Sequence, residues 1–181
     1  MASFASHAKK KLGPEALYEY AVAALGRRAL TERELRLKLA QCAADEAHVD
    51  ETLGRLQAIG YLDDQRTAES HAYSKRELEG LGARRVLNEL RRRGIDQSTA
   101  ERTVEEAYRE VDELELIRQY LERKMGRRLE GKLEDPREVH RLTQRLMRAG
   151  FSVGRIREAL GRVAADPAWL EGLEEPFDGD E

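Results

Sequence analysis

LRLKLAQCAADEAHVDETLGRL, at residues 35–56, carries apolar residues separated by four, ten, four and three positions. The same spacing returns in VLNELRRRGIDQSTAERTVEEA at residues 86–107 and in LTQRLMRAGFSVGRIREALGRV at residues 142–163. Steps of three and four place side chains on one stripe of an α-helix, because 3.6 residues make a turn. The ten-residue step leaves room for a turn and a new helix. Each stretch therefore predicts two helices packed through their apolar stripes, and recurrence at roughly 50 residues indicates tandem units.

The flanking sequence adds one more helix in front of each pair. Pro14 suits the first turn of a helix that runs to about Leu25. Asp63 and Asp64 place negative charge where a helix that runs to about Glu79 would begin. We therefore predict an all-α fold of three tandem three-helix repeats, with no β-strand. The expected divisions are a flexible basic N-terminus (1–13), three repeats (14–62, 63–109 and 110–165) and an acidic tail (166–181).

Capping residues and glycines predict where individual helices begin and end. Thr31 and Glu34 form a Thr-x-x-Glu capping box, in which each side chain satisfies a free main-chain amide of the other residue. Gly60 ends the third helix, since glycine adopts the left-handed conformation of a C-terminal cap without steric cost. Ser152 is expected to cap the final helix, which would end near Ala165.

Composition limits the class of protein. Of the 181 residues, 37% are charged and 6% are aromatic, which suits small helical units with large solvated faces. A net charge of −3 argues against indiscriminate binding to nucleic acid. Cys42 is the only cysteine, so an internal disulfide is excluded and a reducing compartment is expected. No apolar run is long enough to span a membrane, so we expect no contact with membranes. We also expect the protein to be cytoplasmic and monomeric.

Catalytic motifs are scarce in this sequence. The four histidines lack the spacing of metal ligands, and none pairs obviously with Cys42. Lys132 follows a glycine but lacks the glycine-rich loop and the Ser or Thr of a nucleotide-binding motif. Asp63 and Asp64 are explained more simply by helix capping than as a catalytic pair. We therefore expect no enzymatic activity, metal or cofactor. The histidines are His7, His48, His71 and His140.

Arginines gather on the outer faces of two expected middle helices. Helical spacing turns one set away from Leu90 and a second set away from Leu146. A charged face is often simply solvated, but two equivalent stripes favour a surface that binds DNA phosphate or acidic protein. The helix–Gly–helix segments also resemble helix-turn-helix elements, although any short helical hairpin needs the same apolar positions. The candidate partner-binding residues are Arg84, Arg85, Arg92, Arg137, Arg141, Arg145 and Arg148.

Several motifs, taken in order, resemble the RecX family of regulators of the bacterial RecA recombinase. The opening motif is Arg28-x-x-Thr31-x-x-Glu34-Leu35-x-x-Lys38-Leu39, followed by Gly60-Tyr61-Leu62-Asp63-Asp64. The central motif is Gly82-x-Arg84-Arg85-Val86-x-x-Glu89-Leu90-x-x-x-Gly94-Ile95. The C-terminal motif is Leu146-x-Arg148-x-Gly150-Phe151 with Ile156 and Leu160. The resemblance extends over about Glu15 to Ala165.

The resemblance implies three three-helix repeats in an elongated, curved array. It also implies binding to RecA and to RecA–DNA filaments, with inhibition of strand exchange, coprotease activity and ATP hydrolysis. Such a protein would modulate recombination, DNA repair and the SOS response without catalysing a reaction. Two other functions remain open from the residues themselves. One is a regulator that binds DNA directly, weakly or through its helix-turn-helix-like units, and the other is a structural adaptor for other proteins.

Overall fold

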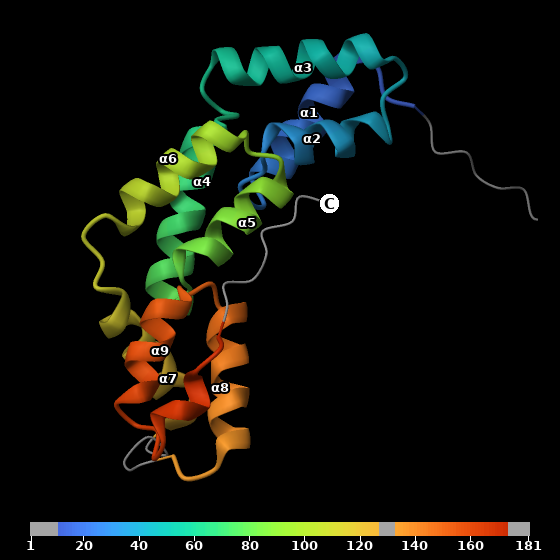
Figure 1. Cartoon of the computed structure of the whole chain (residues 1–181). Coiled ribbons are helices and arrows are strands. Elements are labelled where there is room, and N and C mark those ends of the chain that lie inside the picture. Colours follow the sequence, from blue (N-terminus) through green and yellow to red (C-terminus); the bar gives the residue numbers. More distant parts are fainter. Residues whose placement is uncertain (1–10, 127–132, 174–181) are drawn as a thin grey trace, which may run out of the picture. The chain divides into compact units, whose positions relative to one another are not determined.

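The computed structural model describes residues 11–126 and 133–173, and the regular elements in these ranges are all helical (Figure 1). Two isolated β-bridges, Leu12 with Ala43 and Leu133 with Ala164, are the only β pairing among the described residues. The predicted all-α class is thus confirmed. The helices are α1 (Pro14–Leu25), α2 (Glu32–Ala40), α3 (Glu46–Ala58), α4 (Asp64–Ser74), α5 (Ala83–Arg93), α6 (Gln97–Tyr108), α7 (Glu113–Met125), α8 (Pro136–Arg148) and α9 (Val153–Gly161).

The three helix pairs predicted from the repeated spacing are α2–α3, α5–α6 and α8–α9. Of the apolar positions that define the spacing, all but Ala107 and Val163 are buried. The chain groups into two compact units, which are described here separately. Unit 1 contains residues 1–67 and 92–96, and unit 2 contains residues 68–91 and 97–181. Helices α4 and α5 each begin in one unit and end in the other.

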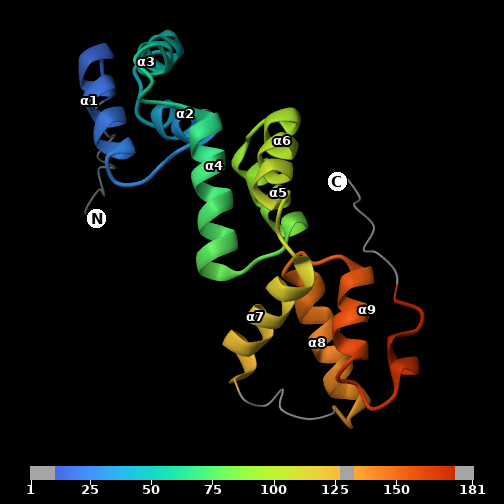
Figure 2. The same cartoon turned by 90° about the vertical axis from the view of Figure 1, so that its left-hand side faces the viewer.

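In unit 1, helices α1, α2 and α3 pack around a leucine-rich core (Figures 1 and 2). The predicted capping box is present: the Thr31 hydroxyl accepts from the Glu34 amide, and the Glu34 carboxylate accepts from the Thr31 amide. Gly60 has φ of +67°, as its capping role requires. Most of the predicted flexible N-terminus lies outside the described residues. Leu12, within it, exchanges main-chain hydrogen bonds with the turn after α2, at Cys42 and Ala44.

In unit 2, α7, α8 and α9 enclose the larger core, which includes Phe151 stacked edge-on against Tyr120. The helical run that begins with α4 does extend to Glu79, but its last turn, Lys75–Glu79, widens into a π-helix before Gly80. The start of the predicted acidic tail also belongs to this core. Pro167–Leu170 forms a 3-10 turn, and Leu170 is buried.

Two predictions about α9 are wrong. Ser152 does not cap the helix; instead its amide and hydroxyl donate to the Glu113 carboxylate at 2.7 and 2.9 Å. The helix ends at Gly161 rather than near Ala165, because the chain beyond it pairs with Leu133. The Leu133 amide donates to Val163 at 2.7 Å, and its carbonyl accepts from Ala165 at 2.9 Å.

Each unit contains a contact in which the turn after one helix is hydrogen-bonded to the start of another helix. In unit 1, the turn after α5 meets the start of α2, where the Thr31 hydroxyl donates to the Arg93 carbonyl at 2.7 Å. In unit 2, the turn after α8 meets the start of α5, where the Gly82 amide donates to the Ala149 carbonyl at 2.8 Å. Both turns contain a glycine of nearly equal φ, +90° at Gly94 and +89° at Gly150. We call these the Gly94 joint and the Gly150 joint.

Candidate functional site

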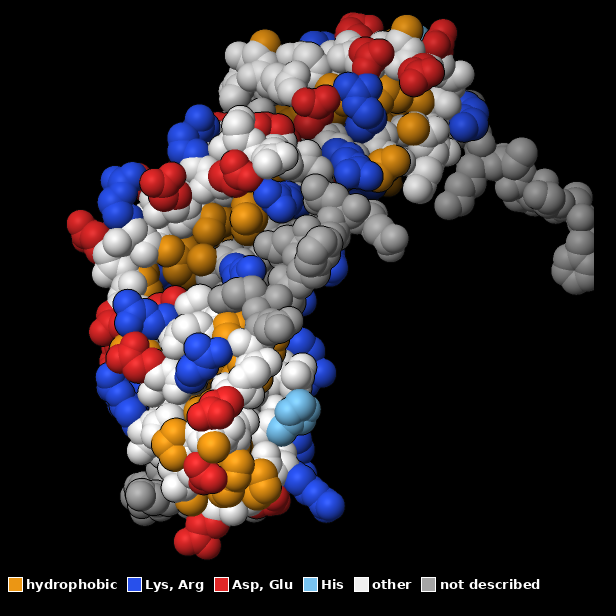
Figure 3. All heavy atoms as spheres, in the orientation of Figure 1, with side chains coloured by type: hydrophobic (Ala, Val, Ile, Leu, Met, Phe, Trp, Pro, Cys, Tyr) orange, Lys and Arg blue, Asp and Glu red, His pale blue; other side chains and the backbone are white. Residues whose placement is uncertain are grey.

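Four arginines form a stripe along α8, which we call the α8 stripe. Arg137, Arg141, Arg145 and Arg148 are all exposed, and steps of four, four and three keep them on one side of the helix. The opposite side of α8 is fixed in the core by side chains that include Leu142 and Leu146. Lys and Arg side chains accordingly line the edge of the molecule along α8 (Figure 3).

The charge of the α8 stripe is not neutralised within the part of the chain that the structure describes. None of its four arginines has a carboxylate partner among those residues. Exposed guanidinium groups without internal partners keep their hydrogen-bond donors available for phosphate or carboxylate groups. The α8 stripe therefore carries positive charge that no described carboxylate neutralises.

The arginines of α5 are arranged differently. Arg85 donates to Glu89, one turn along the same helix, at 2.7 Å. The Glu89 carboxylate also lies within hydrogen-bond distance of His71 Nε2, at 3.0 Å, and 3.6 Å from the Lys75 ammonium. Burial by itself raises the pKa of Glu89, but the hydrogen bond from Arg85 and the nearby cations lower this pKa below its ordinary value. Glu89 thus stays ionised and neutralises part of the predicted basic face.

The other two predicted arginines of α5, Arg84 and Arg92, differ in exposure. Arg92 is exposed and has no ion-pair partner within the described ranges. Arg84 is half-buried, and its amide donates to the Gly150 carbonyl at 3.3 Å. Since Arg148 precedes Gly150 by two residues, the Gly150 joint brings the end of the α8 stripe next to Arg84. The two stripes are therefore unequal: α8 carries unpaired charge, whereas α5 is partly neutralised.

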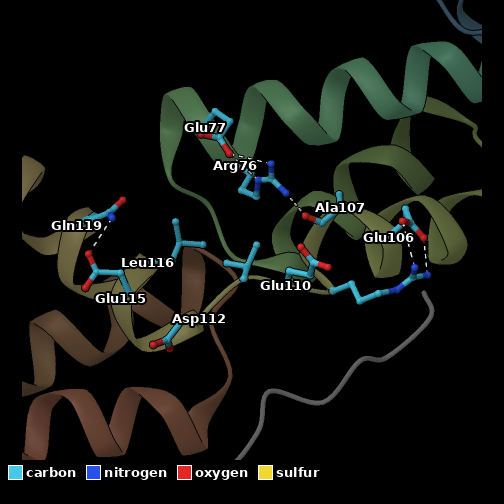
Figure 4. Close-up of a pocket in the computed structure, with 11 residues that line it drawn as sticks. Arg76, Glu77, Glu106, Ala107, Glu110, Asp112, Glu115, Leu116 and Gln119 are labelled. Atoms are coloured by element: carbon cyan, nitrogen blue, oxygen red, sulfur yellow. Dashed lines mark hydrogen bonds and ion pairs between the residues drawn. The ribbon is translucent and has the colours of Figure 1, made fainter.

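A hollow of about 560 Å³ in unit 2 lies where α6 and the π-helical turn face the start of α7 (Figure 4). Carboxylates dominate its rim, but most are already engaged. Glu115 is held by Arg118 and Gln119, and the hydrogen bond from Arg118 lowers the pKa of Glu115 to about 2. Arg76 spans the hollow, paired with Glu77 and donating to the Ala107 carbonyl. No histidine, cysteine or serine is among the described residues that line it.

The structure also bears on the candidate metal ligands, the aspartate pair and a possible membrane span. Within the described ranges, no group of three or more His, Cys, Asp or Glu residues is arranged to hold a metal ion. His7, Gly131 and Lys132 lie outside those ranges. Asp63 and Asp64 act as helix caps: Asp63 accepts from the Arg66 amide, and Asp64 accepts from the Glu32 amide at the start of α2. None of the described helices is both long and apolar enough to cross a bilayer.

Two features escaped the sequence analysis although the sequence contains a signal for each. Glu89 lies four residues after Arg85, the spacing at which helical residues of opposite charge pair. Tyr20, Ala23, Ala24 and Arg27 follow the three- and four-residue spacing of one helix face, and together they line a groove on unit 1.

The fold and the α8 stripe define the class: a tandem three-helix-repeat protein with an exposed row of arginines. Residues 18–56 match the family model described as RecX, first three-helix domain, and residues 63–104 match RecX, second three-helix domain. The regulatory protein RecX of Halorhodospira halophila is 37% identical over 152 residues, covering 84% of this chain and 91% of that protein. The chain therefore belongs to the RecX family of regulatory proteins.

Two solved structures support the fold independently. The crystal structure of RecX from Lactobacillus salivarius matches with a TM-score of 0.60 at 19% identity, covering 82% of this chain and 95% of that chain. A second crystal structure, of a regulatory protein RecX, matches with a TM-score of 0.64 at 22% identity, covering 82% of this chain and 71% of that chain. The architecture is thus shared where sequence identity is low.

Proposed function

We propose that this chain binds RecA and RecA filaments on DNA and inhibits their strand-exchange, coprotease and ATPase activities. It would thereby modulate recombination, DNA repair and the SOS response. Membership in a family of regulatory proteins is the observation that carries this proposal. In this proposal the chain acts by binding, and the exposed, unpaired arginines of the α8 stripe support a role for that surface.

The α8 stripe is the proposed contact with the filament, through acidic RecA surface or DNA phosphate. Its arginines are exposed and have no carboxylate partners among the described residues. Binding therefore does not require an internal ion pair to be broken first. Arg84 is placed next to the stripe by the Gly150 joint, whereas Arg85 contributes less because Glu89 holds it.

The test is a RecA ATPase assay on single-stranded DNA with increasing amounts of this protein. The wild type is expected to lower the rate of ATP hydrolysis, and Arg141→Glu with Arg145→Glu is expected to need a much higher concentration. Arg155→Glu with Arg162→Glu is the matched control, since both arginines are exposed on unit 2 but pair with Glu158. Equal inhibition by both double variants would remove the α8 stripe from the proposal. No inhibition by the wild type would refute the function itself.

A second candidate is a regulator that binds DNA directly. The unpaired charge of the α8 stripe favours it, because arginines that contact phosphates supply most non-specific affinity for DNA. Fluorescence anisotropy with a labelled duplex, in the absence of RecA, separates the two functions. Direct binding predicts an affinity that falls steeply between two salt concentrations. Inhibition of RecA without measurable duplex binding would leave the protein contact as the explanation.

A further inference from the structure

A groove of about 230 Å³ lies on unit 1, lined by one face of α1, the connection from α1 to α2, and Lys38 in the last turn of α2. Its floor is apolar: Leu30 is buried there, and Ala23 and Ala24 present only methyl groups. At one end stands Tyr20, whose side chain is 43% exposed. Small side chains on an exposed helix face allow another chain to approach the helix closely. The groove thus has room for an apolar side chain that this unit does not itself supply.

The rim of the groove is positively charged. Arg27, Arg28 and Lys38 line it, and no carboxylate is among the described residues that line it. Arg28 is held in place by Glu34 at 3.3 Å. Arg27 and Lys38 have no ion-pair partner in the described ranges. An apolar floor below two unpaired cations complements a ligand that carries an apolar side chain between negative charges.

We propose that this groove binds an acidic peptide segment of a partner protein, with one aromatic or large aliphatic side chain between its carboxylates. The apolar side chain occupies the floor beside Ala23 and Ala24, against the ring of Tyr20. The flanking carboxylates pair with Arg27 and Lys38. Such a peptide would bind because its apolar side chain is removed from water, while its carboxylates fix the position of the peptide along the groove. The proposal concerns unit 1 alone, and it does not depend on RecA or on the α8 stripe.

The experiment is a fluorescence anisotropy titration of the full chain with a labelled synthetic peptide. The probe has one central phenylalanine with four glutamates on each side, and the matched peptide has alanine in place of phenylalanine. Burial of part of the phenylalanine ring is expected to make the first peptide bind about tenfold more tightly, since about 1.4 kcal/mol corresponds to a factor of ten. Equal affinity for the two peptides would overturn the proposal, because it would show attraction by charge alone.

Variants separate the groove from other basic surfaces. Arg27→Glu with Lys38→Glu is expected to weaken binding about tenfold, as attraction becomes repulsion at two sites. Ala23→Gln fills the hollow without changing charge and is expected to weaken binding severalfold. Arg155→Glu with Arg162→Glu makes the same charge change at two exposed arginines of unit 2 that pair with Glu158, and it should alter the affinity less than about twofold. Circular dichroism melts check that each variant folds. An equal loss in the two double variants would also overturn the proposal.

Discussion

The Gly94 joint and the Gly150 joint make similar connections with different chemical groups. At the Gly94 joint, side chains hold the turn: the Thr31 hydroxyl donates to the Arg93 carbonyl, and Arg93 pairs with Glu34 at 2.9 Å. At the Gly150 joint, main chain meets main chain through the Gly82 amide. A Cβ atom on Gly82 would collide with the Gly150 main chain. One joint therefore depends on specific side chains, and the other depends on the absence of side chains.

Two joints of similar geometry should therefore tolerate substitution differently. At the Gly94 joint the outer atoms of the Arg33 side chain can rotate away, but its Cβ is fixed to α2, so damage there should be smaller without being negligible. The main chain at the Gly150 joint cannot move without shifting α5 or α8, because interiors are packed closely.

Gly150→Ala should destabilise the protein by about 3 kcal/mol or more. Its φ of +89° disfavours alanine, and the added Cβ would overlap the Arg85 main chain. Gly94→Ala should cost less, about 2–3 kcal/mol, because its Cβ would overlap side-chain atoms of Arg33 rather than main chain; the Arg33 Cδ can rotate away, but the Arg33 Cβ is fixed to α2. Gly60→Ala is the control for backbone conformation alone, since φ is +67° but nothing lies within 4 Å of the added atom. Urea unfolding of the three variants gives the order, and equal losses at Gly94 and Gly150 would contradict the contrast.

Thr31→Val should cost about 2 kcal/mol. The substitution keeps the shape of a fully buried side chain but leaves the Glu34 amide and the Arg93 carbonyl without their partner. Thr31→Ser retains the hydroxyl and should lose only about 1 kcal/mol, the contribution of one buried methyl group. Chemical denaturation of both variants makes the comparison. If serine proved as damaging as valine, the hydroxyl would not be what holds this joint.

Glu34→Gln should cost about 0.5–1 kcal/mol at neutral pH, and the cost should disappear in acid. Burial by itself raises the pKa of Glu34, but hydrogen bonds from Arg93 and the Thr31 amide bring this pKa below its ordinary value of 4.5. A lowered folded-state pKa stabilises the fold above pH 4.5, and this stabilisation is lost as pH falls through the folded-state pKa.

Unfolding of wild type and Glu34→Gln at a series of pH values checks this prediction. The two free energies of unfolding should converge as the pH falls below 4.5 and through the lower folded-state pKa of Glu34. Burial raises the pKa of Asp64, which has the opposite pH dependence, but Asp64 is common to both proteins and cancels in the difference. A difference that stays constant down to acid pH would show that the Glu34 charge does not contribute to the joint.

The sequence was sufficient for features that depend on neighbours along the chain. Helical spacing predicted the buried leucines and the exposed α8 stripe, and the Thr31–Glu34 box lies within one turn. Features formed between distant residues were missed. Ser152 was correctly singled out as polar at the start of a helix, but the Glu113 carboxylate, 39 residues away, accepts its hydrogen bonds. The early end of α9 likewise depends on Leu133, which no local pattern places there.

Ser152 follows Gly150 and Phe151 directly, and Ser152→Ala tests whether a side-chain hydrogen bond contributes to the Gly150 joint. We expect this effect to be the smallest. The variant loses the hydroxyl bond to Glu113 but keeps the amide bond to the other carboxylate oxygen. Because the site is only partly buried, water can replace the hydroxyl, and the expected cost is about 0.5 kcal/mol. Urea unfolding beside Thr31→Val should therefore show a clearly smaller loss. A loss as large as that of Thr31→Val would mean that the Gly150 joint also depends on side chains, which would remove the distinction between the two.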